Sequence, residues 1–141
     1  MDAEFVLLLR YLIRSGKVVE NRIDDLLGNV DLSATKMLSL RYMEQAEEPL
    51  PLGQLASSLA FVKSNMTQLA DHLEADHLVE RVPDVNDRRS KLLKLTDEGK
   101  HQCNNALKIL EPLESQLRET FTPDEQRLLI VLLQRLNDAL E

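Results

Sequence analysis

Two short helical patterns, separated by only three or four residues, lie in the middle of this 141-residue chain and restrict its fold more than any other feature. The first covers residues 54–59 and the second covers residues 63–78, and in each the apolar side chains recur along one face of a helix. Two helices joined by so short a connection are typical of a helix-turn-helix.

Two short strands are predicted to follow these helices. Residues 79–83 and 91–95 have strand-like patterns on either side of a predicted turn at residues 84–90. Leu93 falls on one face of the second strand and Lys94 on the other, which is the alternation of a half-buried strand. Because a two-stranded ribbon is not stable alone in water, we expect it to depend on the rest of the domain.

Helices are also predicted before this central region. Residues 5–27 have helical spacing, with an interruption expected at residues 15–16. Ser33 is the expected N-cap of a second helix, which runs to about residue 46. Residues 50–52 contain a proline and are expected to form an edge strand at most.

The C-terminal third is predicted to be helical. Thr96 is the expected N-cap of a helix that runs to about residue 121 and bends at Pro112, where one backbone donor is missing. The sequence TPDE at residues 122–125 combines a cap, a first-turn proline and a glutamate that completes a capping box. The last helix, with LLIVLL at residues 128–133, is apolar nearly all round, so it must be buried. This chain has too few other helices to cover it, which predicts a second copy.

The distribution of charge is compatible with a DNA-binding face only in the middle of the chain. The whole chain has a formal net charge of −7, which argues mildly against nucleic acid as a partner. However, residues 53–95 hold six basic and six acidic side chains, whereas the segments on both sides are acidic.

Several features predict a cytoplasmic protein without a membrane anchor. Cys103 is the single cysteine, so no internal disulfide can form, and a structural role is favoured for it over peroxide sensing. The N-terminus carries acids before its apolar run, unlike a signal peptide. The longest uncharged apolar run, residues 128–133, is too short to cross a bilayer.

No pattern of an enzyme is present, so no catalytic residue, cofactor or metal site is predicted. The four glycines are isolated and form no phosphate-binding loop, and neither a GxSxG nor an HExxH motif occurs. His72 and His77 are five residues apart on one predicted helix and would point about 140° apart, so they cannot share a metal ion.

The middle of the chain resembles the multiple-antibiotic-resistance regulator (MarR) family of winged-helix transcription factors. The resemblance rests on LSATKMLSL at residues 32–40, QLASSLA at residues 54–60 and KSNMTQLADHLEADHLVERVPDVNDRRSKLLKLTDEG at residues 63–99. Its most specific part is Asp87-Arg88-Arg89, followed by Leu95-Thr96 and then by Gly99. It implies a mostly α fold with a small β-wing. The winged helix-turn-helix domain would cover residues 31–98, and dimerisation helices would cover residues 1–30 and 99–141.

The resemblance also implies a function. A homodimeric, sequence-specific transcriptional regulator is expected, a repressor acting on a pseudo-palindromic operator in double-stranded DNA. Its recognition helices would enter successive major grooves and its wings the flanking minor grooves. Family members commonly bind small, often phenolic anions and then release DNA, so the resemblance makes an effector of this kind a candidate partner, without assigned residues. The sequence leaves open whether this chain responds to a ligand, to an oxidant or to neither. The alternative is a helical protein-interaction module of the same fold that has lost DNA binding.

Candidate DNA-binding residues fall into two groups. In the first two turns of the recognition helix they are Lys63, Ser64, Asn65, Thr67 and Gln68. In the wing they are Asp87, Arg88, Arg89 and Lys91. By the resemblance Arg89 is the minor-groove residue, and Asp87 is expected to hold it through a charge-assisted bond. The alternatives are a solvated polar face on the helix and a surface ion pair in the wing.

Three positions depart from the pattern of the family. Ala60 stands where a glycine of the turn is usual, and Val62 stands where a hydroxyl cap usually precedes the recognition helix. Gln68 replaces a common basic residue. These departures affect the expected operator sequence and affinity more than the expected fold.

Overall fold

The computed structural model describes residues 2–59 and 63–141, except the side chains of Lys63 and Ser64. The chain divides into two compact units, Met1–Ile109 and Leu110–Glu141. Ala60 and Val62, two of the positions that depart from the family pattern, lie outside the described residues. Among the described helices, none combines the length and the apolar character that are needed to span a bilayer.

The first unit begins with helix α1 (Ala3–Leu27), a short 3₁₀ turn η1 (Gly28–Val30) and helix α2 (Ala34–Ala46). The predicted interruption at residues 15–16 is wrong, because α1 is continuous through Gly16. The prediction for Ser33 is confirmed, since its hydroxyl accepts the N–H of Lys36 at 3.2 Å and caps α2. Asp24 of α1 accepts the N–H of Ala34 at 2.6 Å, which fixes the entry to α2.

The helix-turn-helix consists of α3 (Leu52–Ser58) and α4 (Lys63–Ala75), as the spacing predicts. Helix α4 ends three residues earlier than predicted. His77 adopts a left-handed conformation with φ of 62°, and the N–H of Leu78 bonds to the carbonyl of Leu73 at 2.9 Å, which terminates the helix. The apolar face of α4 is anchored by Met66 and Leu73, both fully buried.

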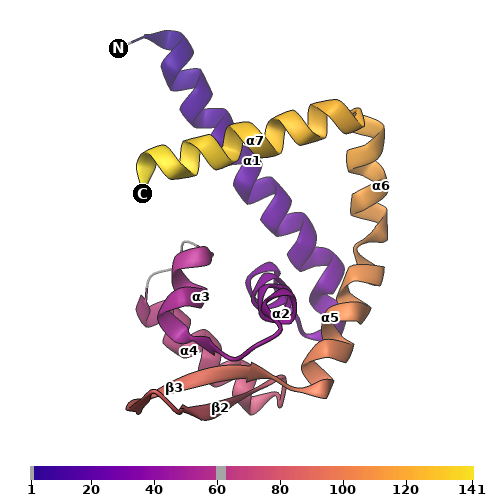
Figure 1. The fold of residues 1–141 in the computed structure, drawn as a ribbon. Coiled ribbons are helices and arrows are strands. Elements are labelled where there is room, and N and C mark those ends of the chain that lie inside the picture. Colours follow the sequence, from indigo (N-terminus) through magenta and orange to yellow (C-terminus); the bar gives the residue numbers. More distant parts are fainter. Residues whose placement is uncertain (1, 60–62) are drawn as a thin grey trace. The chain divides into compact units, whose positions relative to one another are not determined.

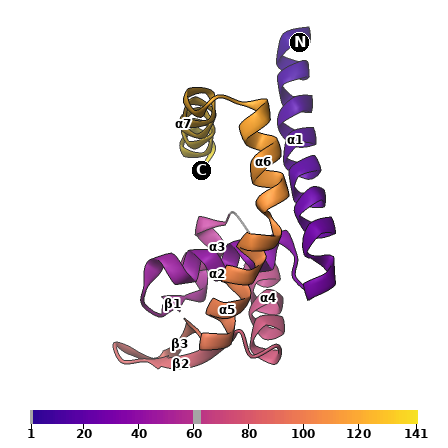
Figure 2. The ribbon, with the colours of Figure 1, turned by 90° about the vertical axis from the view of Figure 1, so that its right-hand side faces the viewer.

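A three-stranded antiparallel sheet completes the winged domain. Its strands are β1 (Leu50–Pro51), β2 (Val79–Asp84) and β3 (Asp87–Leu95), in the order β1-β3-β2, so β1 is an edge strand as predicted. The sheet lies below α2 and α3 in the views of both Figure 1 and Figure 2. We use the term wing for the β2–β3 hairpin, residues 79–95.

The predicted turn at residues 84–90 is wrong, because strand β3 extends back to Asp87 and only Val85 and Asn86 separate the two strands. The carboxylate of Asp84 accepts the N–H of Asn86 at 2.9 Å, and this local bond supports a tight turn. Arg88 and Arg89 therefore belong to β3, close to its tip, rather than to a loop.

Helix α5 (Asp97–Ile109) closes the core of the first unit against α2. The helix predicted over residues 97–121 is divided at Leu110, and α6 (Glu111–Thr120) starts the second unit with Pro112 in its first turn. Helix α7 (Pro123–Leu140) follows, and its predicted capping box is confirmed. The Thr122 hydroxyl accepts the N–H of Glu125, whose carboxylate accepts the N–H of Thr122.

Candidate nucleic-acid interface

Helix α4 places the described candidate residues for base recognition on its exposed surface. Asn65, Thr67 and Gln68 are all exposed, whereas Met66 between them is fully buried. Helix α4 begins at Lys63, but the side chains of Lys63 and Ser64 lie outside the described set. An amide at Asn65 and at Gln68 provides both a donor and an acceptor, which suits the edge of an adenine in the major groove.

The wing carries three exposed cations near its tip, at Arg88, Arg89 and Lys91. Figure 2 shows this tip extending away from α4 and α5. Side chains of Arg89 and Lys91 share one face of β3, because alternate residues of a strand point to the same side. None of the three forms an ion pair with any residue that the structure describes.

Asp87 does not hold the Arg89 guanidinium in the way the sequence suggested. Its carboxylate instead accepts the backbone N–H of Arg89 at 3.0 Å. The bond is local because the two residues are only two apart, so it shapes the backbone at the start of β3. As a result, the guanidinium of Arg89 remains available to a partner such as a phosphate or a narrow minor groove.

Arg81 on β2 connects the wing to α4, and the residue types alone do not predict this connection. Its guanidinium donates to Asp71 at 2.6 Å and to Glu74 at 2.7 Å, and both carboxylates lie on α4. The hydrogen bond with Asp71, more than the one with Glu74, raises the pKa of Arg81 above its ordinary value. No local sequence signal marks this link, because the partners lie ten and seven residues away.

The root of the wing is held by Thr96 and Gly99. The Thr96 hydroxyl donates to the carbonyl of His77 at 2.7 Å and accepts the N–H of Gly99 at 2.9 Å, which confirms Thr96 as the cap of α5. The N–H of Thr96 also donates to the carbonyl of Leu78 at 3.1 Å. The Leu-Thr-x-x-Gly pattern therefore joins the end of α4, the end of β3 and the start of α5.

Comparison with known proteins identifies this arrangement. A model of the MarR family matches residues 32–91, which include α2, the helix-turn-helix and most of the wing. The structure of a mutant of MarR from Escherichia coli in complex with operator DNA superposes with a TM-score of 0.84 and 25% sequence identity. That match covers 96% of this chain and 99% of the other.

This chain belongs to the MarR family.

A relative in the same family supports this assignment over most of the chain. The HTH-type transcriptional regulator PrsX of Escherichia coli is 28% identical over 131 residues, which are 92% of this chain and 79% of PrsX. The organohalide-sensing regulator RdhR, in its form bound to 2,4-dichlorophenol, shares the fold with a TM-score of 0.83 at 18% identity. That match covers 99% of this chain and 82% of RdhR. This MarR-family protein is therefore a DNA-binding transcriptional regulator and not an enzyme.

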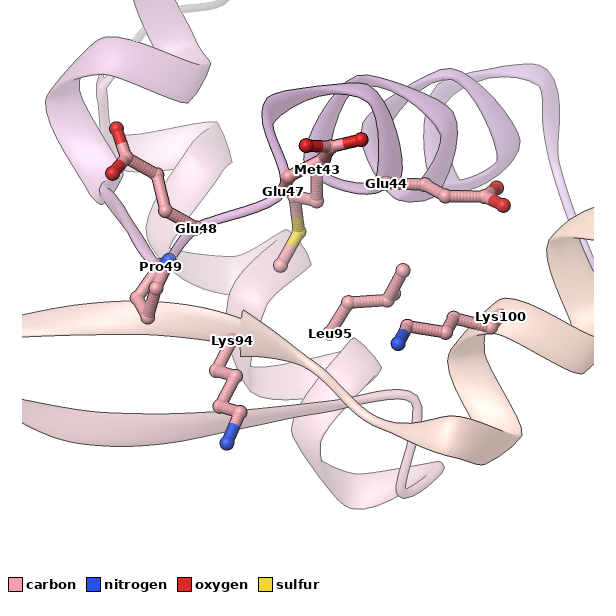
Figure 3. Close-up of a pocket in the computed structure, with 8 residues that line it drawn as sticks. All are labelled: Met43, Glu44, Glu47, Glu48, Pro49, Lys94, Leu95 and Lys100. Carbon is pink, nitrogen blue, oxygen red and sulfur yellow. The ribbon is translucent and has the colours of Figure 1, made fainter.

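One cavity of this MarR-family protein has a lining suited to a small amphipathic molecule. It measures about 420 Å³ and is open to solvent at the C-terminal end of α2. Figure 3 shows Met43 and Leu95 facing its interior, with the ammonium group of Lys100 beside Leu95 and that of Lys94 directed away. Its lining residues are Met43, Glu44, Glu47, Glu48, Pro49, Lys94, Leu95 and Lys100.

Cys103 of this MarR-family protein is a structural residue of the core between α2 and α5. It is fully buried, and burial, together with a hydrogen bond to Glu44, raises the pKa of its thiol to about 11. Peroxide reacts with the thiolate, which is scarce at neutral pH when the pKa is this high.

The histidines do not gather into a metal site. His77 lies beyond the end of α4, so the predicted helical spacing from His72 does not apply. In the described part of the chain, no three His, Cys, Asp or Glu side chains are placed to hold a metal ion.

Proposed function

We propose that this MarR-family protein is a homodimeric transcriptional repressor that binds a pseudo-palindromic operator in the cytoplasm. The proposal rests on two surfaces that belong to the same compact unit: the exposed polar surface of α4 and the three cations at the tip of the wing. None of these cations forms an ion pair with a described residue. An exposed polar helix together with a cationic tip that extends away from it suits simultaneous contact with a major groove and the adjacent minor groove.

Some of the candidate residues would recognise bases, and the others would position the protein on the DNA backbone. Asn65 and Gln68 would read adenine, and Thr67 would contact a thymine methyl group. Arg89 would enter the minor groove. The remaining candidates, Lys63, Ser64, Arg88 and Lys91, would bind phosphates, with Lys63 also suited to guanine, and Asp87 would shape the wing.

The dimer is supported by apolar side chains that a single chain leaves exposed. In α7, Leu128 is 57% exposed and Ile130 and Val131 are each 49% exposed, and α1 exposes Phe5 and Leu8 similarly. A run of this kind is normally covered by another surface. We therefore assign residues 1–30 and 99–141 to dimerisation and residues 31–98 to DNA binding.

An effector would regulate release of DNA. A phenol or another small anion would bind near Lys100, whose ammonium group lies beside the apolar side chain of Leu95. The carboxylates of Glu44, Glu47 and Glu48 also line this cavity and would oppose a negative charge, which favours a phenol over a fully charged anion. The complex of RdhR with 2,4-dichlorophenol shows that a protein of this fold accepts such a molecule. Adding phenolic acids to the protein–DNA complex and measuring release would test this part of the proposal.

The central experiment is selection of genomic fragments by the purified protein, followed by titration of a selected duplex at fixed salt. Arg89→Ala should weaken binding roughly ten- to hundredfold, while the oligomeric state stays unchanged. Arg118→Ala is the matched control, because it removes the same charge from an exposed site on α6. If the purified protein selects no duplex, or if Arg89→Ala binds as wild type does, the interaction module becomes the better reading.

A further inference from the structure

We propose that Arg81 is a positioning residue, which holds the wing at a set distance from the recognition helix α4 so that both contact DNA together. The inference rests on the proposed function, since it assumes that both elements bind one duplex. It starts from three bonds, two from the guanidinium to Asp71 and Glu74 and one from the backbone. The N–H of Arg81 donates to the second carboxylate oxygen of Glu74 at 3.3 Å.

The three bonds together restrain the strand more than a single surface ion pair would. An exposed pair contributes little because both side chains are mobile and screened by salt. Here the Arg81 side chain is only 26% exposed, and its planar fork reaches two carboxylates at once. Glu74 binds both the side chain and the backbone of Arg81, so it fixes the main chain of β2 and not only a flexible tip.

The position of Arg81 in the sheet extends this restraint to the DNA-contacting residues. Arg81 is paired with Leu93 of β3, and Arg89 lies four residues before Leu93 on the same strand, toward the tip of the wing. On α4, Asp71 is three residues, about one turn, after Gln68. Arg81 therefore links a residue one turn from the proposed base contacts to the strand that carries the proposed minor-groove contact.

Removal of the two carboxylates that bind Arg81 distinguishes a positioning role of Arg81 from a simple effect of charge on DNA affinity. The double variant Asp71→Ala, Glu74→Ala deletes two negative charges from the recognition helix and leaves Arg81 in place. If charge alone mattered, this variant would bind DNA more tightly, because fewer acids would oppose the phosphates. If Arg81 acts by positioning, binding should weaken about tenfold, since the wing is no longer held.

The experiment titrates the selected duplex with wild type, the double variant, Arg81→Lys and Arg81→Met at the same salt concentration. Arg81→Lys keeps the charge but cannot bridge both carboxylates, so it should weaken binding nearly as much as Arg81→Met. Arg118→Met is the control for loss of an arginine whose ion pair stays within one helix. Because Arg118 lies in a segment assigned to dimerisation, sedimentation velocity must show that this variant is the same oligomer as wild type. Deuterium exchange should rise in residues 79–95 of the double variant and stay unchanged in α2.

The results distinguish failure of this inference from failure of the proposed function. Wild-type binding together with a strong effect of Arg89→Ala supports the function. If those two results hold but the double variant binds as tightly as wild type or more tightly, Arg81 has no positioning role. If wild type binds no duplex, both proposals are overturned. Matching thermal unfolding of wild type and variants would show that a loss of binding does not come from a loss of folded protein.

Discussion

Gly99 lies so close to Leu78 that a β-carbon on Gly99 would come within 2.1 Å of the Leu78 carbonyl oxygen. The same β-carbon would lie 2.6 Å from the Cδ1 atom of Leu95. Only a glycine allows α5 to start this near the end of the recognition helix. The Leu78 carbonyl cannot move away without loss of a hydrogen bond, because it accepts the N–H of Thr96. The final glycine of the Leu-Thr-x-x-Gly pattern thus has a steric cause.

Replacing Gly99 by alanine should lower the free energy of unfolding by about 1–3 kcal/mol, as expected for an overpacked site. Urea denaturation of wild type and variant would measure the difference. Gly16→Ala is the contrasting variant, because a β-carbon there would meet no atom of the described residues within 4 Å beyond its neighbours and the local helix backbone, and because alanine favours a helix. It should raise stability by about 0.5–1 kcal/mol. Equal stability of Gly99→Ala and wild type would contradict the steric argument.

Thr96→Val removes both hydroxyl bonds at the root of the wing while keeping the shape of the side chain. The change leaves the N–H of Gly99 without its cap and should cost about 1–2 kcal/mol. Thr96→Ser preserves the hydroxyl and should cost clearly less. Thermal unfolding of the three proteins would measure the order, and a serine variant as unstable as the valine variant would argue against the hydrogen bonds.

Stability should fall between pH 9 and pH 11 because of Cys103. The folded state raises the pKa of this thiol from 9.0 to about 11, so in this range the unfolded chain binds fewer protons than the folded protein. The stability contributed by the neutral thiol is fully present below pH 9 and is lost as the pH rises through the folded value. Cys103→Ala lacks this contribution, so the difference between the two proteins should shrink or reverse with rising pH. A pH-independent difference would show that the thiol does not titrate in this way.

Ile130→Glu should shift the protein from dimer to monomer if α7 is covered by a second copy. A carboxylate in a dry interface loses its hydration without gaining a partner, so the dissociation constant should rise at least about tenfold. Sedimentation velocity over a range of concentrations would measure the change. Gln134→Glu, which adds the same charge on a polar position of the helix, is the control. Identical sedimentation of Ile130→Glu and wild type would place the interface elsewhere.

Local signals predicted the helices of this protein well, and long-range pairing explains what they missed. The caps at Ser33, Thr96 and Thr122 each depend on a partner within three residues, so they can be recognised in the sequence. The length of the turn between the strands depends on how far β3 pairs with β2. Asp87 and Ser90 are residue types that favour turns, and Asp is depleted in strands, so residue type alone predicts a longer turn than the pairing of β3 with β2 produces.

The candidate site divides in the same way. The exposed positions of Asn65 and Gln68 follow from helical spacing, and the DNA-binding roles of these residues and of Arg89 stay predictions. The bridge from Arg81 to α4 could not be predicted from residue types, because its geometry depends on the left-handed turn at His77. That turn is itself unusual for a residue with a β-carbon.

The unbroken course of β3 makes the tip of the wing sensitive to small rotations at its base. Arg89 lies six residues before Leu95, which corresponds to roughly 20 Å of extended chain. A tilt of about 5° at Thr96 would then move Arg89 by roughly 2 Å, which is more than the range of donor–acceptor distances over which a hydrogen bond persists. A molecule in the cavity beside Leu95 would act at the base of strand β3, where a small displacement produces a larger displacement of Arg89 at the tip.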